Sequence, residues 1–225
     1  MARTITFQSF SQLAIAEFGT IPKRGLAYLA IAGAAVAVSD LIFWLHRPDV
    51  LLIDYAVGAA LLLGWGALLY AVSMTMMDSR LSVTGFIRFI ITSVAMILPT
   101  ALALGLLWLS ATYKIGAGMA FSGVLFIISL VVITLLPGWP VMQAKSTKLI
   151  GPLAALRATR GIRWSLILAG FVTAGLSRAL PMIPSATEVW SALTLAVLAG
   201  VIAVFFAMIA ISIAVASAKL MLAEN

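Results

Sequence analysis

The chain has 225 residues, of which 64% are hydrophobic and only 9% are charged, and its mean hydropathy is +1.18. Soluble domains carry roughly 25% charged residues, so this composition excludes a water-soluble globular surface. The formal charge of +7 comes from basic residues that flank apolar runs. We interpret them as topology signals and as contacts to anionic lipid, and we expect no nucleic-acid partner.

Cysteine is absent from the chain, which removes disulfides, thiol catalysis and thiolate metal sites. The first 24 residues hold no compact apolar run after a charged start. The sequence therefore predicts no cleaved signal peptide, and the first membrane span is expected to act as the targeting element.

Residues 4–20 have the pattern of an amphipathic helix. Apolar residues at 7, 10, 14 and 18 recur at helical spacing, and the polar residues, Glu17 among them, fall elsewhere on the helical wheel. We expect a helix that lies in the membrane interface and ends before Pro22. Packing of this helix against a protein core is the alternative.

Six longer apolar segments follow, and each is long enough to cross a hydrocarbon core of ~30 Å as an α-helix. Their expected bounds are 25–45, 51–77, 85–109, 118–136, 162–180 and 189–218. The links after the first three are short, which favours antiparallel packing of consecutive helices. The sequence therefore predicts an all-α fold, a polytopic bundle of six transmembrane helices that forms a single membrane domain. Its parts are residues 1–24 (cytoplasmic amphipathic segment), 25–142 (spans one to four), 143–161 (cytoplasmic connector) and 162–219 (spans five and six).

The basic residues give this bundle an orientation. With the N-terminus inside, eleven of the 14 Lys and Arg residues lie on the inner side, and only Arg47, Lys114 and Arg178 lie on the outer side. Cytoplasmic loops of membrane proteins carry such an excess of positive charge. We expect a multi-pass protein of a bacterial inner membrane with both termini in the cytoplasm.

The connector at 143–161 predicts a short helix that lies along the cytoplasmic face. Pro152 suits the first turn of this helix, and Gly161 suits its C-terminal cap. Basic residues in the connector and at neighbouring span ends predict contacts with anionic lipid. These residues are Lys23, Arg24, Lys145, Lys148, Arg157, Arg160 and Arg163.

A charged residue, Asp40, lies inside the first span, on a face that also carries Gly33 and Ala37. Small residues at that spacing mark a helix–helix contact, so the carboxyl should face the bundle. Arg178 lies at a similar depth in the fifth span, on a face that carries Gly170 and Ala174. It is the expected partner, with Asp54 as its main competitor. A structural salt bridge is favoured over a gate or a proton or substrate site, and both interpretations stay open.

The sixth span carries small residues at every third or fourth position, which permits close backbone approach. This seam consists of Ala196, Gly200, Ala203, Ala207, Ala210 and Ala214. We expect the seam to pack against another helix of the same chain. A homo-oligomer or a partner membrane protein is the alternative occupant.

The sequence shows no enzyme signature. The motifs of zinc metalloproteases, serine hydrolases, P-loop proteins and dinucleotide-binding proteins do not occur, and one His with no Cys leaves few groups for hydrolytic catalysis. His46 has no second His or Cys to complete a metal site. We expect no catalytic residue, no metal and no cofactor.

One stretch in the second half of the chain is similar to a known pattern. Residues 136–141 read Leu-Pro-Gly-Trp-Pro-Val, and Pro152-Leu153, Thr159-Arg160-Gly161 and Trp164 follow. This pattern resembles six-helix bacterial inner-membrane proteins of the YciC-like type, and the membrane domain attached to some glycerophosphodiester phosphodiesterases. The resemblance implies a six-helix bundle with a cytoplasmic amphipathic helix before the fifth span. It does not imply phosphodiesterase activity, because this chain has no room for that domain.

The leading hypothesis from the sequence is a non-enzymatic inner-membrane protein that acts as an accessory or interaction component. The first alternative is a small transporter or channel that uses the region of Asp40 and Arg178. The second alternative is an enzyme that acts on lipid.

Overall fold

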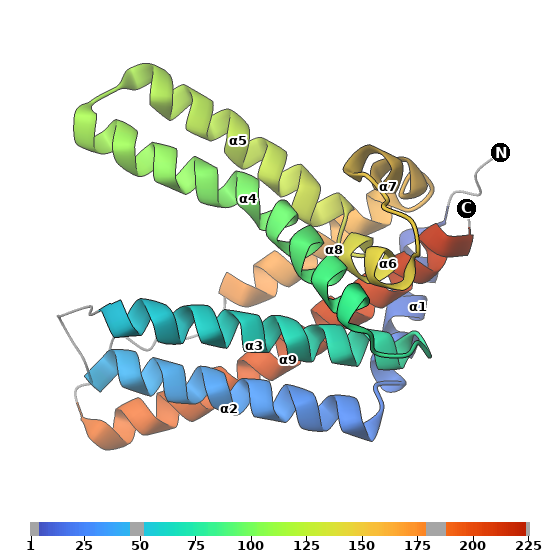
Figure 1. The fold of residues 1–225 in the computed structure, drawn as a ribbon, viewed down its shortest axis with the longest axis horizontal. Coiled ribbons are helices and arrows are strands. Elements are labelled where there is room, and N and C mark those ends of the chain that lie inside the picture. Colours follow the sequence, from blue (N-terminus) through green and yellow to red (C-terminus); the bar gives the residue numbers. More distant parts are fainter. Residues whose placement is uncertain (1–4, 46–51, 179–187, 224–225) are drawn as a thin grey trace. The chain divides into compact units, whose positions relative to one another are not determined.

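The computed structural model describes residues 5–45, 52–178 and 188–223, and it describes the side chains of these ranges except at 43, 52–62 and 174–178. All regular structure within these ranges is helical, as the sequence predicts (Figure 1). The helices are α1 (Phe7–Gly19), α2 (Lys23–Leu45), α3 (Leu52–Met76), α4 (Val83–Tyr113), α5 (Gly116–Leu135), α6 (Trp139–Lys145), α7 (Pro152–Ala158), α8 (Arg163–Arg178) and α9 (Val189–Ala223).

Helices α2, α3, α4, α5, α8 and α9 coincide with the six apolar segments of the sequence. Four stretches of the described chain are long and apolar enough to cross a membrane, and they are Lys23–Ile42, Val83–Tyr113, Gly116–Leu135 and Val189–Ala223. The described apolar parts of α3 and α8 are shorter, at Leu63–Met76 and Arg163–Thr173. The four long apolar helices indicate a membrane protein.

Helix α4 has 31 residues and extends beyond its expected end at residue 109. Its N-cap is Ser82, whose side chain accepts a hydrogen bond from the Gly85 N–H at 3.0 Å, and the helix continues through Pro99. Lys114 ends it in the left-handed conformation, with φ of 54°. At 1.5 Å per residue the helix is about 46 Å long, which is more than the ~30 Å needed to cross a hydrocarbon core at right angles.

The helices form two compact units, which we describe separately: residues 1–11, 82–170 and 216–225 form the first, and residues 12–81 and 171–215 form the second. In the first unit α4 and α5 are antiparallel neighbours, as their short link predicts (Figure 1). Small and hydroxyl side chains line their contact. The Ser122 hydroxyl donates to the Ala103 carbonyl at 2.8 Å, and the hydroxyls of Thr100 and Ser129 hydrogen-bond to each other.

The chain after α5 forms two short helices in the same unit. The first, α6, was not expected from the sequence. The second, α7, begins at Pro152 as predicted, but its C-cap is Thr159 and not Gly161. The earlier end has a local cause, because the Thr159 hydroxyl and the Arg163 guanidinium both donate to the Leu156 carbonyl, at 2.9 and 2.7 Å.

Helix α1 confirms the predicted helix but not its predicted polar face. Phe10 is buried as expected, yet Glu17 is also buried and Ile15 is 69% exposed. Phe10 and Glu17 are seven residues apart, which is close to two helical turns, so they lie on the same face. The buried face of α1 is therefore rotated from the one that the phenylalanine spacing indicates.

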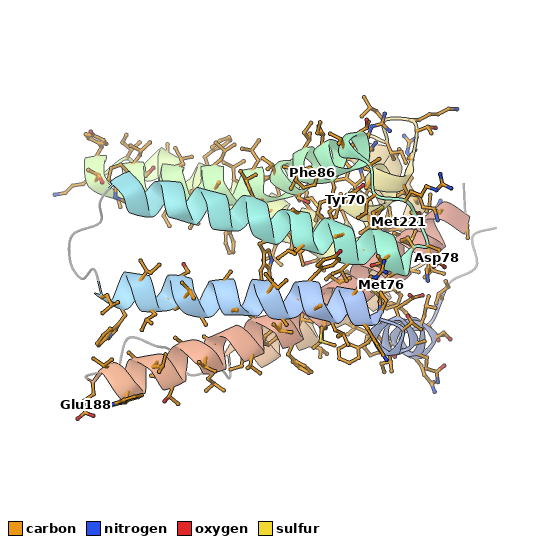
Figure 2. All side chains as sticks on the ribbon, turned by 60° about the horizontal axis from the view of Figure 1, so that its bottom comes forward. Tyr70, Met76, Asp78, Phe86, Glu188 and Met221 are labelled. Atoms are coloured by element: carbon orange, nitrogen blue, oxygen red, sulfur yellow. The ribbon has the colours of Figure 1, made fainter. Side chains whose placement is uncertain are left out.

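In the second unit α3 packs beside α2 and ends in a tight turn. The Ser79 N–H donates to the Met74 carbonyl at 2.9 Å and the Asp78 N–H to the Thr75 carbonyl at 3.2 Å. This is the Schellman pattern, with Asp78 as the left-handed residue at φ of 49°. Figure 2 labels Asp78 with the buried Tyr70 and Met76 on this part of α3.

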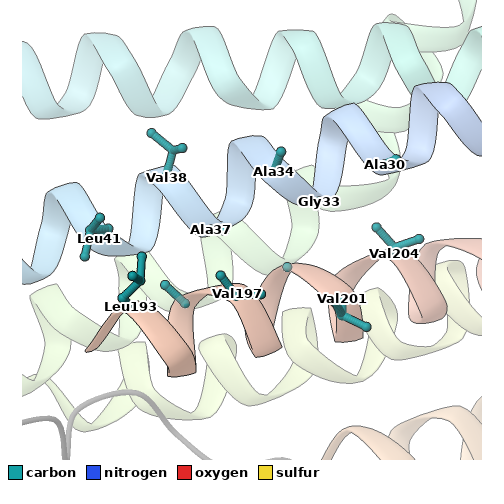
Figure 3. Close-up of a pocket in the computed structure, with 12 residues that line it drawn as sticks. Ala30, Gly33, Ala34, Ala37, Val38, Leu41, Leu193, Val197, Val201 and Val204 are labelled. Atoms are coloured by element: carbon teal, nitrogen blue, oxygen red, sulfur yellow. The ribbon is translucent and has the colours of Figure 1, made fainter. Parts of the chain in front are cut away.

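Helices α2 and α9 approach most closely where two glycines meet (Figure 3). A Cβ atom added at Gly200 would lie only 2.5 Å from the Gly33 carbonyl oxygen and 3.3 Å from the Ala37 Cβ. Beside this crossing runs an open groove of about 540 Å³ that only alanine, glycine, valine and leucine residues line. The groove therefore offers a ligand dispersion contacts and no hydrogen bond from a side chain.

The crossing predicts a specific sensitivity at Gly200. Gly200→Ala should destabilise the protein by about 1–3 kcal/mol, because the new methyl group forces two helix backbones apart. Gly64→Ala in α3 is the matched control, since a Cβ there meets no atom within 4 Å, and it should be neutral or stabilising. Thermal unfolding of both variants in detergent measures the difference. Equal midpoints for the two variants would show that α2 and α9 do not make this contact.

Candidate functional site

The structure describes only part of the predicted charge pair. Asp40 is half-buried on α2, seven residues after Gly33 and therefore on the face that Gly33 turns toward α9. Arg178 is the last residue of α8, and Asp54 lies in the first turn of α3, but both side chains lie outside the described residues. The pairing of Asp40 with Arg178 stays a prediction.

One argument for this pair is weaker in the structure than in the sequence. The sequence placed both charges on small-residue faces, with Gly33 beside Asp40 and Gly170 beside Arg178. Gly33 packs against Gly200 of α9, whereas a Cβ added at Gly170 would lie 3.1 Å from the methyl group of Thr134 in α5. The two small-residue faces thus pack on different helices, and they are not evidence that α2 and α8 meet.

The seam of α9 is packed at its start but does not continue as predicted. Ala196, Gly200 and Ala207 are buried, Ala203 and Ala214 are half-buried, and Ala210 is exposed. Beyond Ala207 the buried positions are Ile211, Ser212, Val215, Ala216, Ser217, Ala218 and Met221. Ala210 precedes the buried Ile211 by one position, which is about 100° around the helix. The buried face of α9 therefore leaves the small-residue seam beyond Ala207.

The packed start of this seam lies against the same chain. The carbonyl oxygen of Gly33 and the Cβ of Ala37 are the groups that a side chain at Gly200 would meet. One turn of α9 further on, Phe205 makes an edge-to-face ring contact with Phe18 of α1, at a centroid distance of 6.3 Å. At Gly200 the close approach that the small residue permits is thus used within the protomer.

The basic residues predicted to contact lipid fall into two groups. Lys23 and Arg24 are exposed in the first turn of α2. The other five surround α6 and α7 in the first unit, where Lys145, Lys148, Arg157 and Arg160 are exposed. Arg163 differs from these four, because it is half-buried and its guanidinium donates to the Leu156 carbonyl. It therefore helps to hold the turn between α7 and α8.

Sequence reasoning did not single out Arg88, which has a defined structural role. It lies in the second turn of α4, is half-buried, and its guanidinium donates to the carbonyl of Ser146, the C-cap of α6. The available signal was its position inside an apolar span, where a guanidinium has to find an acceptor. This hydrogen bond joins the start of α4 to the loop between α6 and α7.

The part of the chain that the structure describes contains no group of three or more His, Cys, Asp and Glu residues that could hold a metal ion. His46 and Asp49 lie outside that part. Comparison with known proteins found no matching family model, no matching curated protein and no matching solved structure. The function is therefore argued from the residues and their geometry.

The predicted charge pair can be tested directly. Asp40→Asn and Arg178→Gln should each destabilise the protein, because each leaves the other charge without its partner in an apolar span, and the double variant should recover part of the loss. Chemical unfolding in detergent gives the coupling energy, expected at about 0.5–3 kcal/mol for residues in contact. Strictly additive effects would refute the pair. Coupling of Arg178→Gln to Asp54→Asn instead would assign the arginine to Asp54.

Proposed function

We propose that this chain is a non-enzymatic integral protein of a bacterial inner membrane. In this proposal it crosses the bilayer six times, with both termini in the cytoplasm, and acts as an accessory or interaction component within the membrane. The resemblance of residues 136–164 to YciC-like inner-membrane proteins is consistent with this role. That resemblance implies no catalytic activity.

The observation that carries the proposed membrane topology is the distribution of charge along the α4–α5 hairpin. At one end of the hairpin Arg88 binds the Ser146 carbonyl, close to Lys145 and Lys148 in sequence. The other end has Lys114, 26 residues further along α4, or about 39 Å at 1.5 Å per residue. Cations concentrate on the cytoplasmic side of inner-membrane proteins. The charge distribution therefore supports a cytoplasmic location for α6 and α7.

The proposed orientation of α4 implies the rest of the proposed topology. If α4 begins inside and ends outside, then α5 returns the chain to the cytoplasm before α6. Helices α2 and α3 then form an outward and an inward span before α4, and α8 and α9 form another such pair after α7. Six spans follow, and the exposed Lys23 and Arg24 then lie at the inner end of α2.

A second candidate function is a small transporter or channel, and Asp40 is the observation that favours it. A carboxyl group inside a membrane span is costly to retain, and such groups often mark ion or substrate paths. If the chain is a transporter or channel, Asp40→Asn should abolish the flux of the transported ion or substrate in reconstituted vesicles. The amount of folded protein should stay unchanged. Under the first candidate, the same substitution changes stability or co-purifying membrane proteins and no flux is found.

Reporter fusions test the proposed topology. A fusion joined after Lys114 should report the periplasm, and a fusion joined after Lys148 should report the cytoplasm, because α5 lies between them as one span. A phosphatase that is active only in the periplasm, paired with a fluorescent protein that folds only in the cytoplasm, gives complementary signals at each site. The same side for both positions would refute the six-span arrangement.

A further inference from the structure

The described residues of the first unit are strongly basic and include no Asp or Glu. Between residues 82 and 170 the sequence contains seven basic residues and no Asp or Glu, and its other described residues, 5–11 and 216–223, add one Lys and no acid. Four of these cations, Lys145, Lys148, Arg157 and Arg160, are exposed between the start of α6 and the start of α8. Within the described residues of this unit, no acidic side chain is therefore present as the counter-charge.

A network of hydrogen bonds fixes the backbone of the loop that carries Lys148. The Trp139 indole donates to the Ile150 carbonyl at 2.8 Å. The buried Gln143 side chain donates to the Lys148 carbonyl at 3.0 Å and accepts from the Ile150 N–H at 2.7 Å. Arg88 binds the carbonyl at the end of α6. The loop 146–151 is therefore held on both sides and presents its side chains from a defined scaffold.

Large apolar side chains are exposed among the same cations. Leu149 is 84% exposed, Leu153 is 71% exposed and Trp164 is 78% exposed. On α7, Leu153 and Arg157 are four residues apart and share one side of the helix, while Ala155 and Thr159, on the opposite side, are fully buried. The exposed side of α7 thus combines an aliphatic side chain with a guanidinium.

Exposed leucine and tryptophan side chains beside lysine and arginine are typical of a protein surface at a bilayer interface. Leucine and tryptophan gain free energy when they leave water, and tryptophan at the start of an apolar helix sits at the level of the lipid headgroups. Lysine and arginine nearby then meet the negative surface potential of anionic lipids. An acidic soluble protein would neutralise the cations, but it would not by itself account for Leu149 and Trp164 beside the start of a membrane helix.

We infer that residues 145–164 form a docking surface for anionic phospholipid headgroups, with Leu149, Leu153 and Trp164 in the interface and Lys148, Arg157 and Arg160 on the phosphates. Guanidinium groups suit this role because they bind phosphate oxygens with two parallel hydrogen bonds. The inference rests on the proposed membrane location, and it adds a lipid class and the residues that select it.

Lipid binding to the purified full-length chain in detergent tests the inference. The probes are phosphatidylglycerol and phosphatidylcholine with the same acyl chains, titrated separately and followed by native mass spectrometry. The wild-type chain should bind phosphatidylglycerol more tightly. Because each cation near an anionic surface changes affinity by about fivefold, Arg157→Gln with Arg160→Gln should lower phosphatidylglycerol affinity by about 25-fold. Affinity for phosphatidylcholine should be unchanged.

Lys114→Gln is the matched control, because it removes one cation from the same unit at the opposite end of α4 and should leave the selectivity intact. If the double variant does not fold, Lys148→Gln replaces it, since the Lys148 side chain is exposed. This substitution should lower the affinity for phosphatidylglycerol about fivefold. Equal affinity for the two lipids, or equal losses in Lys114→Gln and the test variant, would overturn the inference. Displacement of the lipid by inorganic phosphate would also overturn it, in favour of a site for free anions.

This measurement does not depend on the direction in which the chain crosses the membrane. Selective binding together with reporter signals on the same side would refute the proposed topology and leave the lipid surface in place. The expected topology without lipid selectivity would refute the lipid surface and leave the proposed topology in place.

Discussion

The lack of water around the long apolar helices is the constraint on which the structure depends. In hydrocarbon every backbone N–H and C=O has to be satisfied within the protein, which leaves the helix as the form for a single segment. Apolar burial gives little drive for helices to associate there, so close packing and interhelical hydrogen bonds take its place. The contacts of this protein follow that rule, with Gly33 against Gly200 in one unit and Ser122 on the Ala103 carbonyl in the other.

The same constraint explains where polar side chains gather. Along the α4–α5 hairpin the buried polar groups are hydroxyls, which need only one partner on the neighbouring helix or on their own, as Ser122, Ser129 and Thr92 have. Groups with more donors, such as Gln143 and Arg88, occur at the end of the hairpin where loop carbonyls are available. The polar and charged end of the first unit is thus a consequence of how many hydrogen bonds each side chain requires.

The parts of the fold that could be predicted are those set by composition over long windows. The six apolar segments and the start of α7 at Pro152 follow from run length and from the fixed φ of proline. Details set by tertiary contact could not be predicted. Helix α6 is only seven residues long and contains Pro140. Glu17 is buried although the wheel placed it on the polar side, and Ala210 is exposed although it belongs to the small-residue seam. For the candidate sites, residue type indicated the cations, but only the structure separated Arg163, which holds a turn, from the exposed Arg157 and Arg160.

The central claim is that the apolar faces of the α4–α5 hairpin meet lipid while its hydroxyl-lined face is packed. The chain has no cysteine, so single cysteines can carry a nitroxide label at any chosen position. In lipid vesicles, labels at the exposed positions Ile97, Leu104 and Ile127 should be accessible to oxygen and inaccessible to a water-soluble nickel chelate. Labels at the buried positions Ala103 and Ser129 should be inaccessible to both. High accessibility to the nickel chelate at Ile97, Leu104 and Ile127 would place the hairpin in water and contradict the account.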